Sequence, residues 1–130
     1  MKRLLLLAVL LSGCAHASRS IDRRSKIVEL PSGGFRQEGL ASWYGREQQG
    51  GPTASGERFD MRLLTAAHRK LPMQTHVRVT SKLDGRSVDV RINDRGPFSG
   101  KRIIDLSWAA AKVLGMLDRG VIPVVIQVIQ

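Results

Sequence analysis

Three ionisable side chains stand among apolar or turn-forming neighbours, a setting in which proteins present reactive groups: Glu57, His68 and Asp94. Carboxyl and imidazole groups are the usual general acids and bases of enzymes. Each residue also has a structural interpretation. Asp94 opens a Gly-Pro turn and could bind turn amides, His68 could be a core histidine, and Glu57 could be solvated. Residue type and spacing leave both interpretations open.

The sequence gives little support to metal or nucleophile chemistry. His68 and His76 lack the spacing of a metalloprotease site, and His16 lies far away in an N-terminal segment. No Gly-x-Ser-x-Gly motif, which would indicate a serine nucleophile, is present. We therefore expect no metal site and no cofactor.

Short segments predict the strands that position these groups. Residues 76–80 and 87–92 alternate apolar with polar side chains, as half-buried strands do, and residues 40–44 are a further short candidate. Asp84-Gly85 is a favoured dipeptide for a tight hairpin turn. We expect residues 76–80 and 87–92 to pair as antiparallel strands.

One helix and one more strand follow toward the C-terminus. Ser107 can cap a helix over residues 108–114, and Gly115 can end it. The β-branched run 121–129 predicts a buried strand, in which Pro123 requires an edge or a bulge. Several strands and one helix indicate a mainly β fold, a small barrel.

The first residues are typical of a bacterial export signal. Lys2 and Arg3 precede the apolar run 4–11, which is too short to span a bilayer, and small residues then lead to Cys14. We interpret residues 1–13 as a signal peptide. The alternative is an ordinary secretory peptide with a chance cysteine.

The remaining chain divides into a tether and one domain. Residues 14–38 lack sustained periodicity and contain a Pro-Ser-Gly-Gly stretch, so they predict a flexible tether. Residues 39–130 have room for one small core. The net charge of +10 at pH 7 would suggest nucleic acid for a cytosolic protein. For an exported chain we expect anionic lipid or an acidic cell-wall polymer instead, and no nucleic acid.

Five blocks in order along the domain resemble the rare lipoprotein A family of bacterial envelope proteins. They are ASWYG at 41–45, TASGE at 53–57, LTAAH at 64–68, RINDRGPF at 91–98 and RIIDLS at 102–107. The tetrad Leu11-Ser12-Gly13-Cys14 resembles the lipobox that the same family carries.

The resemblance implies a six-stranded double-psi β-barrel with one or two short helices. It also implies a lytic transglycosylase, which cleaves the β-1,4 bond between N-acetylmuramic acid and N-acetylglucosamine in peptidoglycan and leaves a 1,6-anhydro end. Carried over by position, Asp94 is the general acid and base. His68 would position Asp94 or the sugar, and Glu57 would support the site. The alternative is a wall-binding barrel without catalysis.

Residues around these positions receive further expectations. Tyr44, Asn93 and Arg95 lie in the matching blocks, and we expect them to contact substrate. We expect Asp105 to satisfy backbone donors at the start of the helix, and Trp108 to lie in the core.

The resemblance also suggests where the protein works. It implies a lipid on Cys14, palmitate included. Ala15 follows this cysteine in place of the aspartate that retains lipoproteins at the inner membrane. We therefore expect a monomer anchored at the periplasmic face of the outer membrane.

Overall fold

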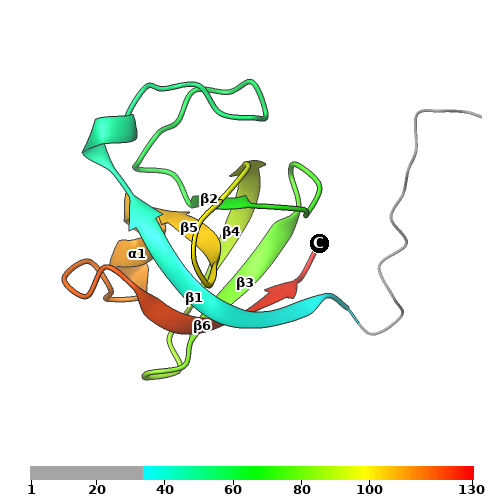
Figure 1. Cartoon of the computed structure of the whole chain (residues 1–130), viewed down its shortest axis with the longest axis vertical. Coiled ribbons are helices and arrows are strands. Elements are labelled where there is room, and N and C mark those ends of the chain that lie inside the picture. The colour runs from blue at the N-terminus through cyan, green and yellow to red at the C-terminus, as the bar shows by residue number, and fades with distance from the viewer. Residues whose placement is uncertain (1–33) are drawn as a thin grey trace, which may run out of the picture.

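The computed structural model describes residues 34–130, which form a closed barrel of six strands (Figure 1). Cys14, the signal peptide and nearly all of the expected tether lie outside the described residues. In chain order the strands are β1 (Arg36–Tyr44), β2 (Thr65–His68), β3 (His76–Ser81), β4 (Ser87–Asp94), β5 (Arg102–Ser107) and β6 (Ile122–Val128). Within residues 34–130, no helix is both long and apolar enough to cross a bilayer.

The order of strands around the barrel is β1-β5-β2-β4-β3-β6, and β6 pairs with β1 to close it. Pairs β1–β5 and β2–β4 are parallel, whereas the other four are antiparallel. The long connection between β1 and β2 contains the 3-10 helix η1 (Arg46–Gln48) and lies over one end of the barrel (Figure 1). A closed barrel leaves no free strand edge at which chains could associate.

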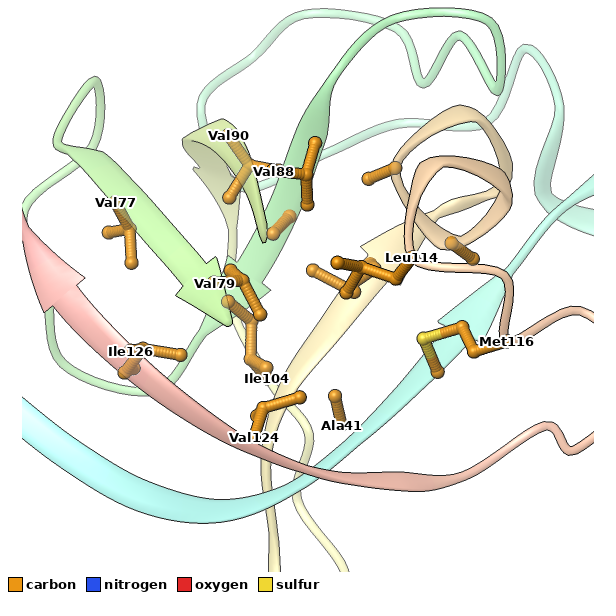
Figure 2. Packing of buried hydrophobic residues seen from close by; sticks show 14 of the residues in the cluster. Ala41, Val77, Val79, Val88, Val90, Ile104, Leu114, Met116, Val124 and Ile126 are labelled. Atoms are coloured by element: carbon orange, nitrogen blue, oxygen red, sulfur yellow. The ribbon is translucent and has the colours of Figure 1, made fainter. Parts of the chain in front are cut away.

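Alternating side chains of the strands fill the interior. Figure 2 shows valines of β3 and β4 facing apolar residues of β5, β6 and the helix α1 (Trp108–Val113). The fully buried members include Val77, Val79, Ile104, Val124 and Ile126. Burying each such side chain contributes about 1.5–3 kcal/mol, and this contribution holds the domain together without a disulfide.

The predicted hairpin and helix are confirmed. Strands β3 and β4 pair antiparallel from His76 opposite Arg91 to Thr80 opposite Ser87. The Ser107 hydroxyl accepts a hydrogen bond from the Ala110 amide at 3.2 Å and so caps α1. The sequence pattern therefore located these two elements correctly.

The expectation for Pro123 was wrong about an edge, because β6 has a partner strand on each side. Pro123 is the second residue of β6, and β3 stops pairing at Ser81, opposite Val124. The Pro123 carbonyl accepts from the Lys82 amide at 2.9 Å, just beyond β3. The missing proline N–H therefore faces the turn after β3, where no ladder donor is needed.

Strand β1 is longer than the predicted 40–44. It begins at Arg36 because residues 36–38 pair with residues 125–127 of β6. The barrel thus takes in three residues that we had assigned to the tether.

Candidate active site

The register of four neighbouring strands places two carboxylates in one row. Asp94 of β4 is paired with Ala67 of β2, Ala67 with Asp105 of β5, and Asp105 with Ser42 of β1. Neighbouring strands lie about 4.8 Å apart, so the backbones carrying the two carboxylates are separated by roughly 10 Å. Ala67, the residue between them in the row, has only a methyl group as its side chain.

A cavity of about 460 Å³ opens over this row. Its lining includes Asp94, Asp105, Ala67, Tyr44 and Arg95. The small side chain of Ala67 leaves the space that a larger residue would fill. Three acidic residues line the cavity, Glu47 from the long β1–β2 connection and the two aspartates of the row. A pair of carboxylates facing one cavity suits acid–base cleavage of a glycosidic bond.

Asp94 ends β4 and is fixed by backbone donors. Its Oδ1 accepts from the Ala54 amide at 2.9 Å and from the Arg95 amide at 2.8 Å. The structural interpretation of Asp94 is confirmed, because Oδ1 binds loop amides. The residue also lines the cavity, and its reactive role stays a prediction. Among residues 34–130, the hydrogen bonds of this carboxylate involve Oδ1, so Oδ2 is left to meet a ligand.

The expectation for Asp105 was wrong. Ser107 caps the helix, whereas Asp105 lies in β5 and faces the cavity. Its Oδ1 accepts from the Ser42 hydroxyl and from the Arg102 guanidinium, the latter at 3.3 Å. The signal was present in the sequence, because Ile104 and Leu106 alternate with Asp105 as buried neighbours of an outward residue do.

Tyr44 contributes a buried hydroxyl to the same cavity. Its ring packs against Phe59, with ring centroids 4.5 Å apart. Burial raises the pKa of the Tyr44 hydroxyl, and the negative charges of Asp94 and Asp105 raise it further. Within residues 34–130, this hydroxyl has no hydrogen-bond partner. The raised pKa keeps this hydroxyl protonated at neutral pH.

Glu57 lies behind the cavity, in a loop bound to the end of β4. Its Oε1 accepts from the Asn93 amide at 2.6 Å and from the Arg91 guanidinium at 2.8 Å. The Arg91 hydrogen bond lowers the pKa of Glu57. In the same loop, the Ser55 amide donates to the Asn93 carbonyl at 3.1 Å. Glu57 thus holds in place the loop whose Ala54 amide binds Asp94.

Replacing Glu57 by alanine is expected to lower the free energy of unfolding by about 1–2 kcal/mol, because it leaves the buried Asn93 amide without its acceptor. Glu57→Gln keeps an acceptor oxygen and is expected to retain more of that stability. Urea unfolding of the two variants measures the difference. Equal stability of Glu57→Ala and the parent chain would show that the loop does not depend on this contact.

The His68 ring faces away from the carboxylate row. Its Nδ1 accepts from the Lys70 amide at 3.1 Å and from the Leu71 amide at 3.0 Å, so Nε2 carries the proton and donates to Gln37 Oε1 at 2.9 Å. Burial, and then the positive charges of Arg95, Arg69 and Lys70, lowers the pKa of His68 to about 4. The imidazole is therefore neutral at pH 7. Its Nε2 ties β2 to β1, and its Nδ1 holds the loop that follows β2.

This lowered pKa predicts a pH dependence of stability. An unfolded chain binds a proton at His68 below its ordinary pKa of about 6.5, whereas the folded chain does not until about pH 4. Stability is therefore full above pH 6.5 and falls as the pH drops toward 4. Thermal unfolding between pH 5 and 7 should show this fall in the parent chain and a flatter profile in His68→Gln. Identical slopes would assign the pH dependence to other groups.

Arg95 and Asn93, the two remaining residues expected to contact substrate, lie in different places. Arg95 lines the cavity, and its guanidinium donates to the His68 carbonyl at 3.2 Å. The Asn93 side chain is buried at 2 % exposure and binds Glu57, so it lies beneath the site.

Trp108 is half-buried and lies outside the core cluster, so the expectation that it lies in the core was wrong.

Residues 36–126 match a protein family described as lytic transglycolase. This chain belongs to the rare lipoprotein A family. It is 60 % identical over 94 residues to a probable endolytic peptidoglycan transglycosylase RlpA of Nostoc sp., and this match covers 71 % of the chain and 25 % of the relative. The endolytic peptidoglycan transglycosylase RlpA of Neisseria meningitidis is 56 % identical over 86 residues, which cover 66 % of the chain and 36 % of the relative.

The relative from Vibrio cholerae is 48 % identical, and this match covers 80 % of the chain and 39 % of the relative. The chain thus spans about a quarter to two fifths of the length of these rare lipoprotein A relatives. A Streptomyces papain inhibitor has the same fold, with a TM-score of 0.62, 25 % identity, and coverage of 78 % of this chain and 99 % of its own. An expansin of Clavibacter michiganensis has a TM-score of 0.58 at 22 % identity, covering 74 % of this chain and 51 % of its own. The predicted double-psi β-barrel is confirmed.

The structure brings together only part of the residue set expected from the rare lipoprotein A resemblance. Asp94, Tyr44 and Arg95 line the cavity, and Asp105 joins them. The side chains of Glu57 and His68 bind other parts of the barrel. Among residues 34–130, no three His, Cys, Asp or Glu side chains form a metal-binding group. The roles of individual residues in the reaction stay predictions.

Proposed function

We propose that this chain is a peptidoglycan lytic transglycosylase. The observation that carries the proposal is the row in which Asp94 and Asp105 flank Ala67 beneath one cavity. Relatives 48–60 % identical to this chain are named endolytic peptidoglycan transglycosylases, which supports peptidoglycan as the substrate. The basic net charge of the chain suits an anionic wall polymer.

The proposed reaction needs one acid and one base and consumes no water. Asp94 acts first as the acid: it gives a proton from Oδ2 to the glycosidic oxygen as the bond from that oxygen to C1 of N-acetylmuramic acid breaks. The 6-hydroxyl oxygen of the same sugar then bonds to C1. Asp94 takes up the proton of that hydroxyl, which restores the starting state. The products are a free 4-hydroxyl on N-acetylglucosamine and a 1,6-anhydro end.

Asp105 would stabilise the positive charge that develops at C1. Its carboxylate is held in place by the ion pair with Arg102 and by the hydrogen bond from the Ser42 hydroxyl. Tyr44 lines the same cavity, where its side chain would contact the bound sugar. The two carboxylates thus take different roles, as they do in ordinary glycosidases.

The proposal is tested by digesting purified peptidoglycan with the residue 34–130 barrel fused to a soluble carrier, and in parallel with the full chain in detergent. Intact peptidoglycan and glycan strands stripped of stem peptides serve as the two substrates. Mass spectrometry should find muropeptides with 1,6-anhydro ends. If the protein binds both substrates but releases none of these products, it is a wall-binding barrel and the proposed reaction is wrong.

We further propose that a lipid on Cys14 anchors the protein, as a monomer, to the periplasmic face of the outer membrane. The lipobox-like tetrad and the absence of aspartate after Cys14 support this location. Growth with labelled palmitate should label the parent chain but not Cys14→Ala. Sucrose-gradient fractions should place the parent chain with outer-membrane markers; co-migration with inner-membrane markers would contradict the location.

A further inference from the structure

A second groove lies beside the carboxylate cavity, where β1 and β5 leave the barrel together. Tyr44 is paired with Ser107 at the ends of these parallel strands, so the next residues, Gly45 and Trp108, emerge side by side. The groove has a volume of about 440 Å³. Trp43 and Trp108, the two tryptophans of the chain, both line it.

The two indoles are held in place by their neighbours. Trp43 packs partly against the hydrophobic core. A methyl group on Gly45 would lie 3.1 Å from a ring carbon of Trp43 and 3.8 Å from Cβ of Trp108, so glycine keeps this space open. On the other side, Lys112 Nζ lies 5.0 Å from the ring centroid of Trp108. Rigid aromatic walls of this kind lose little conformational entropy when a ligand binds.

The groove continues the carboxylate cavity, because Tyr44, Glu47 and Gln48 line both. A polymer that places one sugar over the carboxylates therefore reaches the tryptophans with a neighbouring sugar. Indoles beside polar side chains suit a pyranose, which has apolar C–H faces and polar hydroxyl and acetamido groups. A lipid chain would leave Arg46 and Glu47 without polar partners.

We propose that the groove between Trp43 and Trp108 is a saccharide subsite for the glycan strand, adjacent to the bond that is cleaved. This proposal rests on the proposed function, since it takes the cavity to hold the scissile bond. The subsite gives the enzyme a preference for longer strands, because only these occupy cavity and groove at once.

Tryptophan fluorescence tests the subsite directly, because both fluorophores line the groove. The Asp94→Asn chain is titrated with N-acetylglucosamine oligomers of two and six units. We expect the hexamer to change the emission in a saturable manner and to bind more tightly than the dimer. Binding of the hexamer that calorimetry detects without any change in emission would overturn the subsite.

A variant then measures the contribution of the groove. Trp108→Ala in the same background should bind the hexamer about tenfold more weakly, as measured by calorimetry, because it loses one aromatic contact. Trp108→Phe should recover part of the affinity. Leu83→Ala is the matched control, because Leu83 is 50 % exposed in the β3–β4 turn, at the other end of the barrel (Figure 1). Thermal unfolding checks that each variant folds. If Trp108→Ala does not fold, the affinity of Trp108→Phe for the hexamer decides whether the subsite exists.

Parallel digestion separates the two proposals. If the parent chain releases anhydro-muropeptides but Trp108→Ala and Trp108→Phe bind the hexamer like the control, the function stands and the subsite is wrong. If the hexamer binds through the tryptophans and no anhydro product forms, the subsite stands and the proposed reaction is wrong.

Discussion

Asp94→Asn is expected to slow the release of anhydro-muropeptides by at least about 100-fold, the lower end of the contribution of a general acid or base. An asparagine cannot donate its proton to the glycosidic oxygen and take another from the 6-hydroxyl group. Its carbonyl oxygen can still accept from the amides of Ala54 and Arg95. Chemistry should therefore be lost while the loop and the strand end keep their contacts.

Three measurements make this prediction specific. Mass spectrometry gives the rate of product release, thermal unfolding shows whether the barrel is intact, and sedimentation with insoluble peptidoglycan shows whether binding survives. Asp89→Asn is the matched control, because Asp89 lies on the same strand and pairs with Arg78 on the exposed face of the barrel. If Asp94→Asn cleaves as fast as Asp89→Asn, Asp94 is not the acid and base.

Local patterns in the sequence were sufficient for those elements whose determinants are close in the chain. The β3–β4 hairpin follows from two alternating segments joined by Asp84-Gly85, and α1 follows from Ser107 and the alanines after it. Each depends on contacts between residues a few positions apart. The pattern of strands also indicated a small barrel, whereas the family resemblance supplied its six-stranded double-psi topology, which no local pattern specifies.

Strand β2 shows why the other strands and their register were harder to predict from the sequence. All four of its residues, Thr65–His68, are buried, so it lacks the alternation that marks a half-buried strand. Its register against β4 shifts between Ala66 and Ala67. The row from Asp94 to Asp105 depends on this register, and the two aspartates come from strands that flank β2 without touching each other.

The site residues also differ in whether their environment depends on nearby or on distant parts of the chain. Asp94 could be found because it ends a recognisable strand. The environment of His68 depends on Gln37, 31 positions earlier in the chain, and on the charges of Arg95 and Arg69. The environment of the Tyr44 hydroxyl depends on Phe59, in the long β1–β2 connection, and on the charges of Asp94 and Asp105. Such contacts arise only from the closed barrel, so residue type and spacing left them undetermined.

The row also makes a prediction about Asp105, which the sequence did not single out as a reactive group. Asp105→Asn should slow cleavage by about 100-fold, a loss comparable with the removal of one group that stabilises charge in a transition state. The asparagine oxygen can still accept from Ser42, so little change in thermal stability is expected. Arg102→Gln, which leaves the carboxylate but removes its ion pair, should lose less activity than Asp105→Asn.

Combining Asp94→Asn with Asp105→Asn tests whether the two carboxylates act on one transition state. Residues that act as a unit have strongly non-additive effects on rate. If Asp94 moves the proton while Asp105 stabilises the charge that this transfer creates at C1, the second substitution removes little once the first is present. The double variant should then cleave peptidoglycan within about tenfold of the rate of Asp94→Asn alone. A rate lowered by the product of the two single losses would mean that Asp105 contributes independently, as a binding group and not as a partner in the chemical step.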